Sequence, residues 1–90
     1  MRKQIHAYYS GRVHGIGFRV TARSIAEDLQ VCGWAKNLPD GRVEVVAEAE
    51  EGRIKEFLGQ LYASFSGYIQ DVKIKYVNAF GQYQDFEVRF

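Results

Sequence analysis

Several features are absent from the sequence or occur only once, and each of these absences excludes a class of protein. It has one cysteine, Cys32, so no internal disulfide can form, and the usual structural zinc sites need more thiolates. It has one proline and no low-complexity tract, which favours order throughout. No run approaches the roughly 20 apolar residues of a transmembrane helix. No apolar stretch follows Arg2 and Lys3, so we expect no signal peptide and a cytoplasmic protein.

An excess of charge of one sign is also missing. Twelve Lys and Arg residues stand against eleven Asp and Glu residues, for a net charge of +1. This balance gives no general attraction to nucleic acid or to an anionic membrane, so we expect neither as a partner. With 90 residues, 47% of them apolar, the chain has the composition of a globular protein with one core. We expect a single domain over residues 1–90, and a monomer.

The periodicity of the apolar residues predicts an α+β fold. Alternation predicts strands over residues 3–10, 34–37, 43–49, 72–76 and 86–90. Helical stripes run over residues 18–29 and 54–65. The order of these segments predicts a ferredoxin-like two-layer sandwich, βαββαβ with an antiparallel sheet, a short fifth strand and both helices on one face. We expect Trp34 in the core and Cys32 as a small buried apolar residue.

The most informative segment is the loop between the first strand and the first helix, Gly-Arg-Val-His-Gly-Ile-Gly-Phe-Arg over residues 11–19. A glycine-rich loop that runs into a helix N-terminus presents unpaired backbone amides, which bind anions the size of phosphate. Arg19 adds a planar guanidinium that suits two phosphate oxygens. Spacing alone does not separate this interpretation from a simple turn with a surface arginine.

Other phosphate chemistries match the sequence poorly. The loop lacks Gly-Lys-Ser/Thr, and Val20 stands where a dinucleotide fingerprint needs its third glycine. Cys32 is far from the loop, and no Asp-x-Asp pair is present to form a phosphoaspartate or to hold Mg²⁺. His6 and His14 are too far apart to suggest a metal site by themselves. We therefore expect no metal, no cofactor and no covalent nucleophile.

Two motifs together resemble the acylphosphatase family. The loop at residues 11–19 is similar to the signature loop of that family. The second motif is Gly-Trp-Ala-Lys-Asn at residues 33–37, followed by Asp-Gly-Arg-Val-Glu at residues 40–44, and the closing residues 86–90 are similar to the last strand of the family. The likeness covers nearly the whole chain. It implies a ferredoxin-like domain and hydrolysis of small acyl phosphates without a cofactor, with inorganic phosphate as product and inhibitor.

The resemblance also implies roles for individual residues. Arg19, which ends the loop, would bind the substrate phosphate, and Asn37 would position the attacking water. The backbone amides that would cradle the phosphate are those of His14, Gly15, Ile16, Gly17, Phe18 and Arg19. His14 stands where the family usually has glutamine, and we place its side chain at the rim. An acyl phosphate suits such a site, because its carboxylate leaving group, with a pKa of about 4, needs no general acid.

Alternatives remain open at this point. Asn37 precedes the turn at residues 38–42, and asparagine near a turn often serves the backbone. Ferredoxin-like sandwiches also serve as RNA-recognition and ligand-binding modules, although residues 43–49 are acidic and lack the aromatic residues of an RNA-binding strand. Domains that resemble this one also handle carbamoyl phosphate within hydrogenase maturation proteins.

Overall fold

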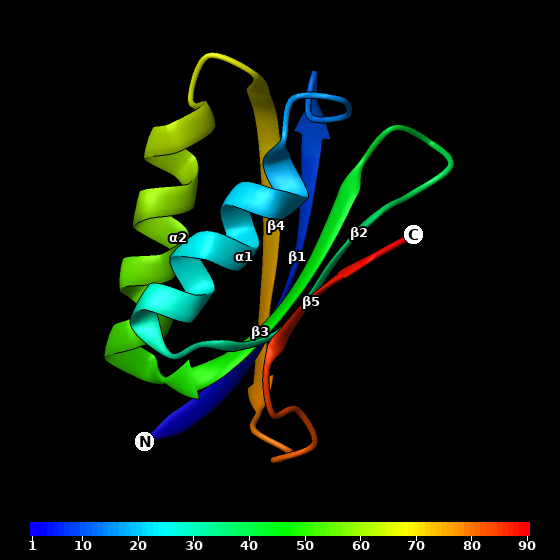
Figure 1. Cartoon of the computed structure of the whole chain (residues 1–90). Helices are drawn as coiled ribbons and strands as arrows, with labels where there is room; N and C mark the ends of the chain where they lie inside the picture. The colour runs from blue at the N-terminus through cyan, green and yellow to red at the C-terminus, as the bar shows by residue number, and fades with distance from the viewer.

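The computed structural model describes residues 1–90 and contains two helices and five strands (Figure 1). In chain order these are β1 (Arg2–Gly11), α1 (Phe18–Leu29), β2 (Cys32–Asn37), β3 (Val43–Glu50), α2 (Glu51–Phe65), β4 (Ile69–Asn78) and β5 (Phe86–Arg89). The expected order of elements is confirmed. Neither helix is long and apolar enough to cross a membrane.

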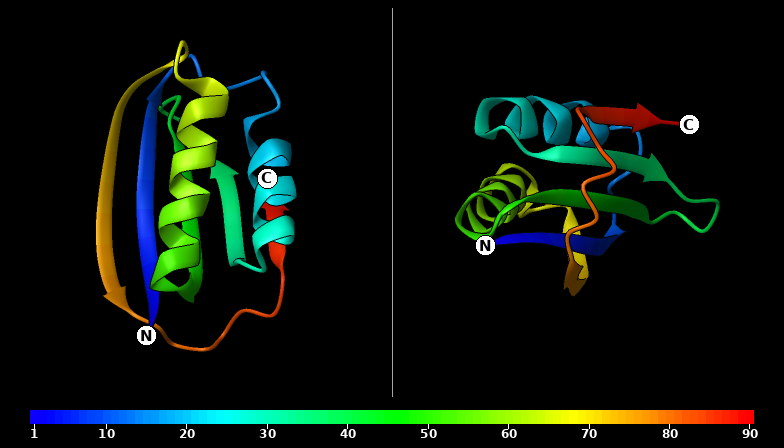
Figure 2. Two further views of the ribbon diagram at one scale, coloured as in Figure 1. Left: turned by 90° about the vertical axis from the view of Figure 1, so that its left-hand side faces the viewer. Right: turned by 90° about the horizontal axis from the view of Figure 1, so that it is seen from below.

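The strands form one sheet in the order β4-β1-β3-β2-β5. The first four strands pair antiparallel, as expected for a ferredoxin-like sandwich, and β5 adds a parallel pair beside β2. The sheet is therefore mixed rather than wholly antiparallel. The reason is the long connection from β4 to β5, which passes from one edge of the sheet to the other and enters β5 in the direction of β2 (Figure 2).

Both helices cover the same face of the sheet, where α1 lies over β2 and β5 and α2 lies over β1 and β3 (Figure 2). The core between the two layers is apolar. The side chain of Phe18, the first residue of α1, is fully buried there. Its ring centroid lies 4.9 Å from that of Tyr9 and 4.9 Å from that of Phe65. This packing fixes the start of α1 above the sheet, and with it the loop that precedes the helix.

The expectations for Cys32 and Trp34 are wrong, because both side chains lie on the face of the sheet away from the helices. The helix-facing positions of β2 are Gly33, Ala35 and Asn37. Cys32 is only half-buried, and its thiol donates to the backbone carbonyl of Glu48 at 3.3 Å. Trp34 is half-buried outside the core, where its indole Nε1–H donates to the Tyr83 hydroxyl at 3.2 Å.

A buried carboxylate anchors the connection from β4 to β5 on the face of the sheet away from the helices. Glu48 is 0% exposed and accepts hydrogen bonds from Phe80 N at 2.8 Å, Gly81 N at 2.9 Å and Gln4 Nε2 at 3.0 Å. Arg2 approaches the carboxylate at 3.5 Å. Burial by itself raises the pKa of Glu48, but the hydrogen bonds from Phe80, Gln4 and Gly81 outweigh burial and lower that pKa. The anchor therefore directs the chain into β5.

Candidate active site

The loop between β1 and α1 turns on two glycines with left-handed backbones. Gly15 has φ 72° and Gly17 has φ 79°, a region that costs other L-residues about 1–2 kcal/mol. A Cβ atom at either position would meet nothing within 4 Å, so the backbone angle, not space, requires glycine here. Gly17 is the N-cap of α1 and provides no side chain to cap the helix. The N-terminal amides of α1 are therefore left open.

These amides have no acceptor within the protein. The first hydrogen bond of α1 runs from Thr21 N to Gly17 O at 2.9 Å, so the amides of residues 18–20 precede the helical ladder. The amides of residues 13–17 donate no backbone hydrogen bond either. A row of free N–H groups at the positive end of a helix dipole is the arrangement that binds anions.

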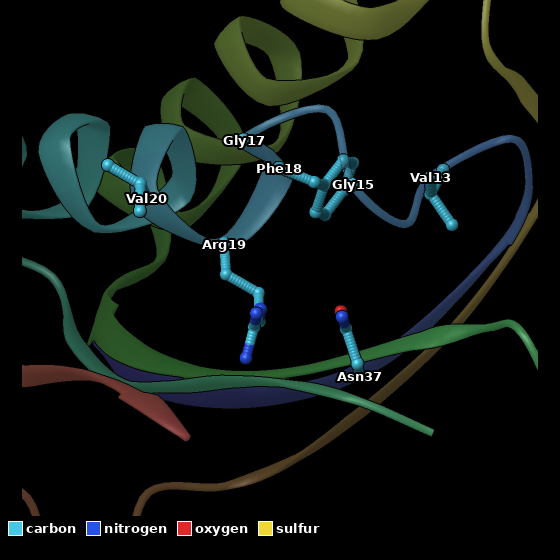
Figure 3. A pocket seen from close by; sticks show the side chains of 7 residues that line it. All are labelled: Val13, Gly15, Gly17, Phe18, Arg19, Val20 and Asn37. Carbon is cyan, nitrogen blue, oxygen red and sulfur yellow. The ribbon is translucent and has the colours of Figure 1, made fainter. Parts of the chain in front are cut away.

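A small pocket opens beneath this loop (Figure 3). Its volume is about 80 Å³, well below the roughly 300–1,000 Å³ of pockets that enclose drug-sized ligands. This volume suits a group the size of a phosphate rather than a whole organic substrate. The residues that line it are Val13, Gly15, Gly17, Phe18, Arg19, Val20 and Asn37. No acidic residue, cysteine, serine or histidine is among them, so the pocket offers no covalent nucleophile and no carboxylate base.

Arg19 comes from the first turn of α1 and is half-buried. Its Nη1 donates to the backbone carbonyl of Arg89 at 2.7 Å. Its guanidinium carbon lies 4.7 Å from the centroid of the Phe90 ring. One nitrogen and one face of the guanidinium are thus held by the end of the chain, which restricts the side chain to the pocket. The remaining N–H groups are available to an anion.

Asn37 ends β2 and shares the helix-facing side of that strand with Ala35. Figure 3 shows its side chain rising toward the loop, facing Arg19 across the pocket. The following turn is held without Asn37, because Arg42 N donates to Asp40 Oδ1 at 3.1 Å and Leu38 N donates to Arg42 O at 2.8 Å. The Asn37 amide has no hydrogen-bond partner within the protein and is free to bind a ligand or a water.

Charges near the turn are paired and fixed. The Arg42 side-chain Nε donates to Asp40 Oδ2 at 2.8 Å. The hydrogen bond from the Arg42 backbone amide is the largest cause that lowers the pKa of Asp40, and the Arg42 guanidinium adds to it. The carboxylate of Asp40 is exposed and directed to Arg42, so it serves the turn and not the pocket.

The family of the chain follows from its sequence as well as from this geometry. The family model for acylphosphatases matches residues 5–88. The chain belongs to the acylphosphatase family. The acylphosphatase of Rubrobacter xylanophilus is 42% identical over 92 residues, which span 97% of this chain and 80% of that protein. The acylphosphatase of Pediococcus pentosaceus is 38% identical over 90 residues, which span 98% of this chain and 99% of that protein.

Solved structures agree with this assignment. The crystal structure of acylphosphatase from Bacillus subtilis superposes with a TM-score of 0.90 at 29% sequence identity, and the match covers 98% of this chain and 99% of that one. Acylphosphatases are hydrolases of acid anhydrides, and this chain hydrolyses the carboxyl-phosphate bond of small acyl phosphates to a carboxylate and inorganic phosphate.

Most of the residues selected from the sequence meet at this pocket of the acylphosphatase. Arg19 and Asn37, 18 positions apart in the sequence, line it together with Gly15, Gly17 and Phe18. Two selected residues do not line it. Ile16 is half-buried and packs against the core, and the His14 imidazole turns away to the carbonyl of Arg42, 2.9 Å from its Nε2.

Sequence reasoning missed Val13 and Val20, which also line the pocket. They flank the loop at its start and within the first helical turn. Their only signal was that they lie in or directly after the segment at residues 11–19, because an apolar side chain carries no chemistry to mark it. Nowhere in the structure do three or more His, Cys, Asp or Glu side chains gather that could hold a metal ion.

Proposed function

We propose that this acylphosphatase binds the phosphoryl group of its substrate with Arg19 and with the backbone amides of residues 14–19. The observation that carries the proposal is the row of amides without internal acceptors above a pocket of about 80 Å³. The transition state of phosphoryl transfer spreads negative charge over the phosphoryl oxygens. Fixed amides and one guanidinium stabilise that charge without reorganisation.

Asn37 orients the attacking water in this proposal. Its side-chain oxygen accepts a hydrogen bond from the water and directs the water oxygen at phosphorus, since no other group of the turn occupies that amide. The new bond forms between the water oxygen and phosphorus while the bond from phosphorus to the acyl oxygen breaks. The bonding electrons leave with the carboxylate, and an oxygen of the substrate phosphate takes the proton of the water.

The site suits an acyl phosphate better than an alkyl ester. A carboxylate leaves without protonation because its conjugate acid has a pKa of about 4, whereas an alkoxide needs a general acid. None of the lining residues can donate a proton as an acid. We propose that the pocket selects the phosphoryl group and leaves the acyl group outside, so that several small acyl phosphates are substrates and inorganic phosphate is an inhibitor.

The remaining expectations about partners stay predictions. We propose that nucleic acid is not a partner, and the surroundings of Tyr8 support this. The Arg42 guanidinium covers that ring at 4.9 Å, and the Tyr8 hydroxyl donates to Glu44 at 3.2 Å, so the ring is not a free stacking platform. A monomeric state and a cytoplasmic location are tested by size-exclusion chromatography with light scattering and by cell fractionation.

The test of the two assigned residues is the hydrolysis of benzoyl phosphate, with and without EDTA. We expect Arg19→Ala to lower kcat/KM by about 10³-fold and to weaken inhibition by inorganic phosphate. We expect Asn37→Ala to lower kcat by about 10²-fold and to leave phosphate inhibition within about 3-fold. Arg23→Ala, an exposed arginine one turn later on α1, is the matched control and should stay active. An Asn37→Ala variant with full kcat would refute the water-positioning role.

A further inference from the structure

His14 is the link between the phosphate loop and the hairpin that carries Asn37. Its imidazole Nε2 lies 2.9 Å from the backbone carbonyl of Arg42. Because a carbonyl has no hydrogen to give, Nε2 carries the proton and donates. This is the one hydrogen bond that joins residues 12–17 to the β2–β3 hairpin.

The acceptor is held firmly in place. The same carbonyl of Arg42 accepts the amide of Leu38, the residue that follows Asn37, at 2.8 Å. The backbone amide and the Nε of Arg42 both bind Asp40, at 3.1 and 2.8 Å. The Arg42 guanidinium also rests on the ring of Tyr8 at 4.9 Å. Arg42 is therefore held at several points, and a hydrogen bond from His14 to its carbonyl sets the position of the loop relative to the hairpin.

The hydrogen bond connects the loop that would bind the phosphoryl group with the hairpin that would position the water. His14 is bonded directly to Gly15, which lines the pocket, and Arg42 precedes Val43, the cross-strand partner of Asn37. Without this hydrogen bond, no polar contact sets the distance from the loop amides to Asn37. A displacement of about 1 Å between a bound group and its attacking partner is enough to lower a rate substantially.

We propose that His14 is a positioning residue, which holds the phosphate loop and Asn37 at the separation that in-line attack by water requires. This inference rests on the proposed role of Asn37. The His14 side chain turns to Arg42 and does not line the pocket, and its substitution leaves the backbone amide of residue 14 in place. Loss of the imidazole therefore lowers kcat and leaves phosphate affinity almost unchanged. The hydrogen that it donates is what matters, so another side chain of similar length with an N–H donor replaces it.

The test compares three substitutions at this position, each assayed for kcat, for inhibition by inorganic phosphate and for melting temperature. We expect His14→Ala and His14→Met to lower kcat by about 10-fold, with phosphate inhibition within about 2-fold. Methionine has the length of glutamine but no donor. We expect His14→Gln to restore kcat to within about 2-fold, because its amide N–H reaches the same carbonyl. Equal activity of the Gln and Met variants would overturn the proposal.

A double-mutant cycle with Asn37 separates this inference from the proposed function. If His14 acts through Asn37, His14→Ala lowers kcat in the wild type and has no further effect in the Asn37→Ala background. The same 10-fold loss in both backgrounds would overturn the positioning role while the role of Asn37 stands. An Asn37→Ala variant with full activity would instead refute the proposed function itself.

Discussion

Replacement of Glu48 by glutamine tests whether one buried carboxylate holds the β4–β5 connection in place. In the wild type its two oxygens accept three hydrogen bonds, two of them from the backbone amides of Phe80 and Gly81. Glutamine has the same shape but one acceptor oxygen, so one of the three N–H donors loses its acceptor, at a cost of about 1–3 kcal/mol. The bonds that remain lose their charge-assisted strength, and relief from burial of a charge offsets part of the loss.

The net expectation for Glu48→Gln is a loss of about 2 kcal/mol of unfolding free energy at pH 7. For a domain of this size, that lowers the melting temperature by roughly 8–16 °C. Urea unfolding followed by far-UV circular dichroism measures it. Glu87→Gln, an exposed carboxylate that pairs with Arg89 at 3.4 Å, is the control and should change stability by less than about 0.5 kcal/mol.

The pH dependence of that loss provides a second test. The folded state lowers the pKa of Glu48, so its contribution to stability is fully present above the unfolded pKa of about 4.3 and disappears as the pH falls through the folded value. The gap between the wild type and Glu48→Gln should therefore be largest near neutral pH and shrink at acidic pH. A variant as stable as the wild type at pH 7, or a gap that widens in acid, would refute this account of the anchor.

Two other predictions concern the pocket. Gly17→Ala should lose about 1–2 kcal/mol of stability and bind inorganic phosphate more weakly, because alanine is disfavoured at φ 79°. Chemical denaturation measures the stability, and an inhibition assay measures the phosphate binding. The control is Gly59→Ala, at an exposed position inside α2, which should stabilise the protein instead. Phe90→Ala should raise KM for benzoyl phosphate by about 2- to 5-fold through loss of an exposed cation–π contact with Arg19. An unchanged KM would show that the ring does not hold the guanidinium.

Local sequence patterns predicted those parts of the candidate site whose residues lie close together in the chain. The glycines, the start of α1 at Phe18 and Arg19 in its first turn all follow from one short segment. Asn37 was assigned through the second motif of the acylphosphatase resemblance, since its position before a turn left two interpretations open. The structure brings Arg19 and Asn37 to one pocket because the antiparallel register of β2 on β3 turns Asn37 to the side of the sheet that α1 covers.

Contacts between distant parts of the chain could not be predicted in the same way. Glu48 alternates with apolar residues and has the pattern of a solvent-facing position, yet it is 0% exposed because the β4–β5 connection covers it. The opposite occurs on β4, where Ile74 and Tyr76 follow a core-like alternation but are 42% and 46% exposed. Since β4 is an edge strand that α2 covers only in part, alternation there does not lead to full burial. The hydrogen bond from Arg19 to Arg89 joins residues 70 positions apart and leaves no local signal.

The central claim is that water, oriented from the side of Asn37, attacks the phosphorus of a phosphoryl group held by the loop. Hydrolysis of benzoyl phosphate in ¹⁸O-labelled water tests it most directly, with mass spectrometry of both products and of the protein during a single turnover. We expect one ¹⁸O atom in inorganic phosphate, no label in benzoate, and no phosphorylated protein. Label in benzoate, or a phosphorylated side chain on the reaction pathway, would contradict it.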